Sequence, residues 1–210
     1  MMILWKNLSL WYLNCLHRRP VLTEMTTSGV LWGAGDILAQ RIDHQDEQHT
    51  SIDWKRTGIQ VVYASCVWAP FSHHWYKLLD QVAVHAVRSV TTHAARRPLF
   101  LATKLALEVV ALHPISLVAF FTFVGMSNGD SWQTCYRQLQ LDLLPTLALE
   151  VAMWTPLDVA NFAFVPVRHQ LLVVNCGCFF ESVALSFIKK HGVFRTPENE
   201  MSSRAVGKND

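Results

Sequence analysis

Five acidic side chains stand inside long apolar stretches of this 210-residue chain: Asp36, Glu108, Glu150, Asp158 and Glu181. An unpaired carboxylate in hydrocarbon costs about 2.5–3.5 kcal/mol on insertion scales, so such groups face protein or water rather than lipid. Carboxylates that line an aqueous passage attract cations. The pattern therefore predicts membrane helices that turn acidic side chains towards one another.

The first acid belongs to a polar stripe on a predicted membrane helix, residues 21–40. At 100° per residue, one narrow face holds four residues: Gly29, Gly33, Asp36 and Gln40. The two glycines allow a second helix to approach closely, because packing holds helices together in lipid. Asp36 and Gln40 either line a cavity or reach the interface at the end of the span.

A second stripe has offsets of four, eight and eleven residues: Glu150, Trp154, Asp158 and Asn161. Its two carboxylates lie about 12 Å apart along a helix axis, which is too far to share a proton. Two interpretations stay open. The acids line a water-filled passage or pair with bases on other helices, or each is hydrogen-bonded inside the bundle in a structural role.

The predicted span 99–126 carries a basic and an acidic residue one turn apart, Lys104 and Glu108. We expect these two to pair, which lowers the cost of burying each. Pro114 follows six residues later and leaves a backbone carbonyl without its helical partner. Further prolines predict bent helices around a central space: Pro70, Pro156 and Pro166.

Composition supports a membrane protein. Charged residues make up 16% of the chain, against roughly 25% in soluble domains, and hydrophobic residues make up 51%. The formal net charge is only +2, and no basic strip with interleaved aromatics occurs, which argues against a nucleic-acid partner. The predicted fold class is an all-α polytopic membrane protein.

The number of crossings depends on the last apolar region. Spans are predicted at 21–40, 57–79 and 99–126, and the region 139–188 is long enough for two, with a break at Val165-Pro166. Basic residues cluster before the first span, between the second and third, and after the last. If these share one side, the number is even, which favours four spans over five. Residues 165–188 would then be re-entrant or interfacial, or 139–166 would not cross fully.

The ends of the chain differ from this membrane domain, residues 21–190. Residues 1–20 form a basic amphipathic segment that contains Lys6, Arg18 and Arg19. This segment is either an interfacial helix preceding the first span or a mitochondrial presequence. The polar tail, residues 191–210, is predicted to be disordered.

Sequence motifs give no support to an enzyme. The five cysteines are odd in number and lack metal or redox spacing, so we expect reduced thiols. His73 and His74 are adjacent and cannot both reach one ion from a helix. No phosphate-binding loop, nucleophile elbow or His-Glu-x-x-His motif occurs. We expect no catalytic activity, cofactor or metal.

Five groups of residues occur in the order and spacing of a known family. They are Gly33-Ala34-Gly35-Asp36 with Gln40, then Asp53-x-x-Arg56, Pro70-x-x-His73-x-Trp75-Tyr76, Lys104 with Glu108 and Pro114, and Trp154 with Asn161-Phe162 and Val165-Pro166. Over residues 5–190 the chain resembles the family named for the Mpv mitochondrial inner-membrane protein and the small, twenty-two-kilodalton peroxisomal membrane protein.

The resemblance implies a membrane protein with about four spans that acts as a small channel or pore for metabolites or ions. The expected location is the mitochondrial inner membrane, with the peroxisomal membrane as the alternative. We expect these residues in the polar interior: Asp36, Gln40, Lys104, Glu108, Glu150, Asp158 and Asn161. We expect these in helix packing: Gly29, Gly33, Pro70, Trp75, Tyr76, Pro114, Trp154 and Pro166.

The chain also departs from the family pattern, mostly in the polar stripes. Asp158 stands for a glutamine, Glu181 for a tryptophan, and Glu108-Val109 for Asp-Gln. The fold is therefore expected to carry over better than any pore selectivity. The alternative function is a structural or assembly subunit of a larger membrane complex, without transport of its own. Expected partners are the lipid bilayer and either further copies of the chain or such a complex.

Overall fold

The structure is a computed structural model that describes residues 2–43 and 51–191, and throughout these residues the fold is helical. The helical segments join end to end into six continuous rods. They are α1 (Met2–Arg18), α2 (Pro20–Asp43), α3–η1–α4 (Trp54–Val62, Tyr63–Trp68, Ala69–Ala86), α5–η2–α6 (His93–Leu107, Glu108–Leu112, His113–Asn128), α7 (Trp132–Phe164) and α8 (Val167–His191). The all-α prediction is confirmed for this part of the chain.

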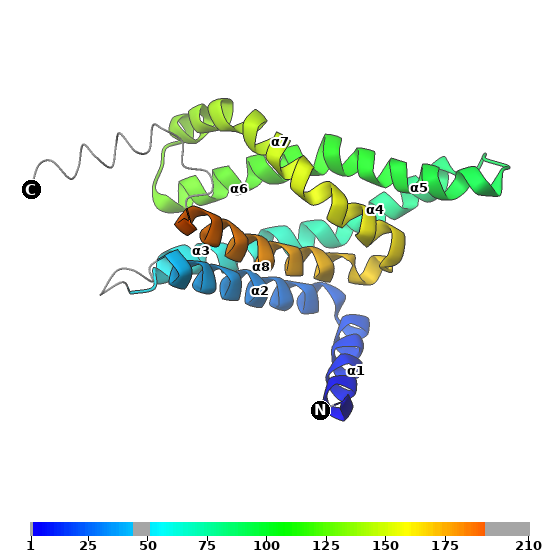
Figure 1. The fold of residues 1–210 in the computed structure, drawn as a ribbon, viewed down its shortest axis with the longest axis horizontal. Coiled ribbons are helices and arrows are strands. Elements are labelled where there is room, and N and C mark those ends of the chain that lie inside the picture. The colour runs from blue at the N-terminus through cyan, green and yellow to red at the C-terminus, as the bar shows by residue number, and fades with distance from the viewer. Residues whose placement is uncertain (1, 44–50, 192–210) are drawn as a thin grey trace, which may run out of the picture.

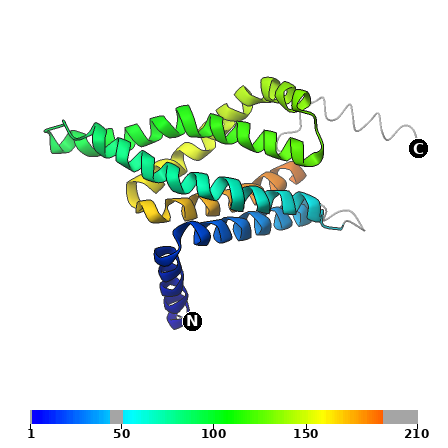
Figure 2. The same cartoon turned by 180° about the vertical axis from the view of Figure 1, so that it is seen from behind.

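The five longer rods run back and forth beside one another, whereas α1 projects away from them (Figure 1). α2 and α8 lie side by side along most of their length, as the view from behind also shows (Figure 2). α7 and α8 are separated at Val165, whose φ of −101° and ψ of 127° are extended. This break agrees with the one predicted at Val165-Pro166.

Two π-helical segments precede two prolines. η1 (Tyr63–Trp68) ends just before Ala69-Pro70, and η2 (Glu108–Leu112) ends just before His113-Pro114. Proline has no N–H and crowds the carbonyl four residues earlier, and a wider turn accommodates both effects. The distortions predicted at Pro70 and Pro114 thus take the form of π turns. Pro156 lies inside the uninterrupted α7.

Large apolar side chains lie on the outside of the bundle and charged side chains lie within it. Val110, Leu144 and Phe164 are at least three-quarters exposed, whereas Glu108 and Lys104 are 1% exposed. Beside these charges, an aromatic core contains Tyr63, Trp68, Tyr76 and Phe162. A surface of this kind suits lipid better than water.

Two helical stretches are long and apolar enough to cross a membrane, Ala94–Asn128 and Trp132–Phe164. Only 22% and 6% of their most apolar windows are buried, so neither resembles the core helix of a soluble protein. The number of crossings, four or five, stays a prediction, and so does the interfacial placement of α1. The predicted disordered tail beyond His191 lies outside the described residues, as do residues 44–50.

Candidate functional site

The glycine stripe of α2 packs against the rod that follows it. A Cβ atom built on Gly29 would collide with the Ser65 hydroxyl, and one on Gly33 would lie 2.8 Å from Val61 Cγ2. Both contacts are too close for any side chain larger than hydrogen. The packing expected for these two glycines is therefore present, and it sets the distance between α2 and α3–η1.

Asp36, at the end of this stripe, is held by three groups. Its Oδ2 accepts hydrogen bonds from Gln40 Nε2 at 2.8 Å and from Thr57 Oγ1 at 2.7 Å, and its Oδ1 lies 2.8 Å from Arg56 Nε. Gln40 also accepts a hydrogen bond from the backbone N–H of Asp53 at 2.7 Å. This network ties α2 to the start of α3 and compensates the buried charge of Asp36.

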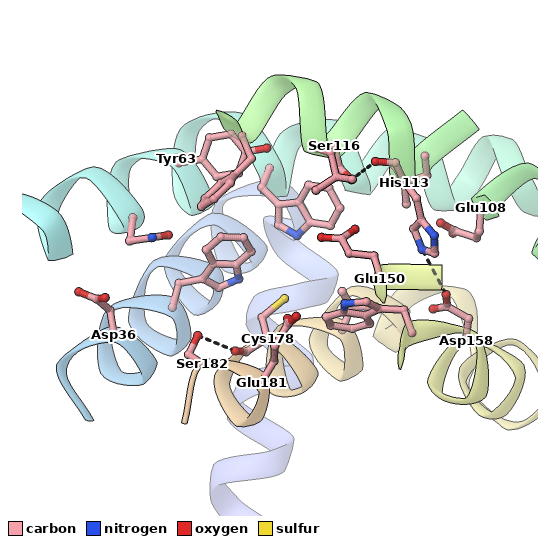
Figure 3. A pocket seen from close by; sticks show the side chains of 18 of the residues that line it. Asp36, Tyr63, Glu108, His113, Ser116, Glu150, Asp158, Cys178, Glu181 and Ser182 are labelled. Carbon is pink, nitrogen blue, oxygen red and sulfur yellow. Dashed lines mark hydrogen bonds and ion pairs between the residues drawn. The ribbon is translucent and has the colours of Figure 1, made fainter. Parts of the chain in front are cut away.

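A cavity of about 340 Å³ lies between α2, α3–η1–α4, η2–α6, α7 and α8 (Figure 3). Its volume falls in the usual range of small-molecule sites. Five carboxyl groups line it, together with one guanidinium and one imidazole: Asp36, Glu108, Glu150, Asp158, Glu181, Arg56 and His113.

The carboxyl groups are spread along the cavity rather than gathered at one point. Asp36 lies at one end and Glu108 and Asp158 at the other, with Glu150 and Glu181 between them (Figure 3). Glu150 and Asp158 are two turns apart on α7, about 12 Å along its axis. The arrangement offers several separate positions for positive charge.

The end of the cavity opposite Asp36, here called the inner end, holds Glu108 and Asp158, and the carboxylates of both have few hydrogen-bond partners. Glu108, 1% exposed, accepts one hydrogen bond from Trp75 Nε1 at 3.3 Å. Asp158, 4% exposed, has His113 Nε2 at 3.7 Å, beyond hydrogen-bond distance. No other hydrogen bond to either carboxylate is formed within the described residues. Two acids are thus buried with most of their acceptor capacity unused.

Aromatic rings form much of the remaining wall. The lining includes Trp32, Tyr63, Trp68, Tyr76, Phe120 and Trp154. Several of these rings also contact one another, with centroids of Tyr63 and Phe120 5.2 Å apart and those of Trp32 and Tyr63 5.9 Å apart. The two π segments contribute Tyr63, Trp68 and Glu108 to this wall, so the wide turns help to shape the cavity.

Four of the seven residues predicted for the polar interior line the cavity: Asp36, Glu108, Glu150 and Asp158. Gln40 does not line the cavity but donates a hydrogen bond to Asp36, which does. Lys104 and Asn161 lie in a separate polar cluster. Two further lining residues, Arg56 and His113, had not been singled out for this site, and Glu181 had been noted only as an acid within an apolar stretch.

The predicted pair between Lys104 and Glu108 is wrong. Lys104 Nζ lies 3.2 Å from Asp80 Oδ1 on α4 and 3.5 Å from Gln170 Oε1 on α8. It also stands over the ring of Phe162, 5.0 Å from the centroid. Lys104 therefore makes its direct contacts with α4 and α8, and within the described residues it forms no salt bridge with Glu108.

Asn161 completes this second cluster. Its amide nitrogen donates to the backbone carbonyl of Gln170 at 3.3 Å, and Gln170 Nε2 donates to the carbonyl of Val165 at 3.1 Å. These bonds bridge the break between α7 and α8, next to Pro166. Asn161, at the C-terminal end of the second stripe, therefore has a structural role.

A third buried cluster was not predicted at all. His73 Nδ1 lies 2.6 Å from Glu24 Oε2, and Lys77 Nζ lies 2.8 Å from His73 Nε2. Since the ammonium of Lys77 donates to Nε2, the other ring nitrogen of His73 donates to the carboxylate of Glu24. His73 and Lys77 are four residues apart and share one helix face. Glu24 belongs to α2, 49 residues away in the chain, and no sequence pattern near His73 indicates that it would be the partner.

Three of the remaining residues expected in helix packing, Trp75, Tyr76 and Trp154, contact neighbouring helices. Tyr76 is 3% exposed and faces Phe162, with ring centroids 6.3 Å apart. Trp75 bonds Glu108, as above. A Cβ on Gly177 of α8 would lie 2.9 Å from the ring of Trp154, so that tryptophan packs directly on the backbone of α8.

Comparison with known proteins identifies the family. The model of the Mpv17 / PMP22 family matches residues 125–186. PXMP2/4 family protein 4 of Dictyostelium discoideum is 30% identical over 164 residues, covering 78% of this chain and 83% of its own length. The chain belongs to the Mpv17 / PMP22 family. The resemblance seen in the motifs is thereby confirmed.

Other members of the Mpv17 / PMP22 family align over most of the chain. Protein SYM1 of Saccharomyces cerevisiae is 28% identical over 180 residues, covering 84% of this chain and 87% of its own. Mitochondrial inner membrane protein Mpv17 of Xenopus laevis is 29% identical over 169 residues, which cover 79% of this chain and 89% of its own length. The Xenopus laevis relative is a mitochondrial inner membrane protein, in agreement with the expected membrane location in mitochondria. No solved structure matches the chain significantly.

Proposed function

We propose that this protein conducts small cations through the cavity between its helices, as a channel of the mitochondrial inner membrane. The observation that carries the proposal is the charge of the cavity wall. Five carboxyl groups line it, and the guanidinium of Arg56 is already paired with Asp36. Carboxylates facing an aqueous passage favour cations over anions.

The depth of the acids supports a functional role. Glu108 and Asp158 are almost fully buried, yet the structure leaves their oxygens with few donors. A bundle that needed only packing would be served better by apolar residues of similar size, because buried ionic groups seldom increase stability. In a conducting protein, water supplies the missing donors and passing cations supply the opposite charge.

Reconstitution of the purified chain in planar bilayers tests the proposal. Under a KCl gradient, the reversal potential should move towards the K⁺ equilibrium value. Asp158→Asn removes one inner carboxylate, so we expect cation preference to fall severalfold. Asp142→Asn is the matched control, since Asp142 lies on the same helix but is exposed and outside the cavity.

Two results would contradict conduction through this cavity. One is an unchanged reversal potential in Asp158→Asn, which would remove that carboxylate from the pathway. The other is absence of current from folded protein that migrates in native gels only within a large assembly. That second result would favour the alternative role, a structural or assembly subunit.

A further inference from the structure

We propose that the cavity binds a linear aliphatic polyamine, a chain of methylene groups that carries several ammonium groups. The inference rests on the proposed function and names the class of cation that the cavity accepts. Three features of the wall carry it: carboxylates with few hydrogen-bond donors, the spread of these carboxylates, and aromatic rings on the same wall.

Asp158 is the buried lining carboxylate that the protein's own side chains compensate least. Its side chain is buried, and within the described residues it accepts no hydrogen bond, with His113 Nε2 at 3.7 Å as its nearest basic group. Glu108 accepts only the indole N–H of Trp75. A buried carboxylate is costly unless donors or positive charge compensate it. An ammonium group, with up to three N–H donors, supplies both.

The spread of the acids selects an extended ligand. The labelled carboxylates occupy the inner end, with Glu108 and Asp158, and the middle, with Glu150 and Glu181 (Figure 3). At the far end, Asp36 is already paired with Arg56. One compact ion can satisfy only one of these positions at a time. A chain with ammonium groups at intervals satisfies the inner and the middle positions together.

The composition of the wall favours an organic cation over a metal ion. No group of three or more histidine, cysteine, aspartate or glutamate residues converges as metal ligands within the described ranges 2–43 and 51–191. Aromatic rings such as Trp154 and Tyr76 line the same wall as the acids. Such rings pack against methylene groups and attract cations over their faces. The cavity of about 340 Å³ holds a ligand of this size.

Binding to the full-length protein in detergent micelles tests the inference, with spermidine as the probe. Isothermal titration calorimetry should detect spermidine binding, with affinity at least tenfold above that for Mg²⁺ or propylamine at the same ionic strength. Asp158→Asn and Glu181→Gln should each weaken spermidine binding about tenfold. Asp142→Asn should bind as the wild type does. Glu181→Gln keeps the test usable if Asp158→Asn fails to fold, as judged by circular dichroism.

The outcomes separate this inference from the channel proposal. Potassium currents in bilayers without spermidine binding would overturn the polyamine site and leave the channel standing. Equal affinity for spermidine, propylamine and Mg²⁺ would also overturn it, since binding would then be general attraction of cations. Spermidine binding that depends on Asp158 and Glu181, without any current, would support the site and overturn conduction.

Discussion

Arg56 has a particular position among the lining side chains, because it is basic, half exposed (48%) and paired with Asp36. Its exposed guanidinium therefore lies where this end of the cavity meets the protein surface. The pair with Asp36 cancels one negative charge at this end. Arg56 therefore reduces the attraction that cations meet on entry.

Arg56→Gln should raise cation selectivity. Asp36 would keep the hydrogen bonds from Gln40 and Thr57 but lose its counter-charge. We expect the reversal potential under a KCl gradient to move further towards the K⁺ equilibrium value. This shift is opposite in direction to the one expected for Asp158→Asn. A shift towards chloride in Arg56→Gln would contradict this role of the arginine.

Lys104 shows how much one distant partner matters. Its amine is 1% exposed, and Asp80 supplies the opposite charge. Asp80→Asn should leave a buried cation with the side-chain oxygen of Gln170, two aromatic rings and the more distant carboxylate of Glu108, at a cost of about 3 kcal/mol. Unfolding in mixed micelles, followed by tryptophan fluorescence, measures this. An unfolding midpoint equal to that of Asp142→Asn would disprove the burial argument.

For individual residues, the sequence predicted which acids lie in the interior better than it predicted which residues they contact. Apolar surroundings alone mark Asp36, Glu108, Glu150 and Asp158 as interior, because a charge within such a stretch must avoid lipid. Partners on other helices leave no such mark. Lys104 was assigned to Glu108 because the two are one turn apart, whereas Asp80 is 24 residues away in the chain.

Helix α2 and the rod α3–η1–α4 are joined through small residues. The Cβ position of Gly33 lies 2.8 Å from Val61 Cγ2, so Gly33→Ala should push the two helices apart and cost about 1–3 kcal/mol. Val61→Ala removes the methyl group that collides. In a double-mutant cycle of unfolding free energies, the pair should lose less than the sum of the single variants. Strict additivity would show that the two side chains do not compete for this space.

The stripes of residues on one helix face were predictable, because the repeat of 3.6 residues per turn holds along a whole α-helix. Gly29, Gly33, Asp36 and Gln40 do share a face, and Glu150, Trp154 and Asp158 do reach one cavity. The π turns were not predictable. Proline signals that a regular helix is disturbed, but whether the chain kinks or widens depends on packing against neighbours. At Pro70 and Pro114 it widens, and at Pro156 the helix continues.

The whole molecule is organised with charge inside and apolar surface outside. Composition alone indicated this, because a chain with 16% charged residues and long apolar stretches has no other way to place its acids. The mitochondrial membrane context is supported by relatives such as the mitochondrial inner membrane protein Mpv17 of Xenopus laevis. The number of rods, however, depends on whether the last apolar region forms one helix or two. The structure shows two, α7 and α8.

The central claim is that the cavity is the route of conduction, and Cys178 provides the most direct test, because this thiol lines the cavity. During bilayer recording, a methanethiosulfonate reagent carrying an ethylammonium group should attach to Cys178, place a positive charge among the carboxylates and reduce the potassium current by more than half. The Cys178→Ser variant should keep its current under the same treatment. Full labelling of Cys178, verified by mass spectrometry, with an unchanged current would contradict the account.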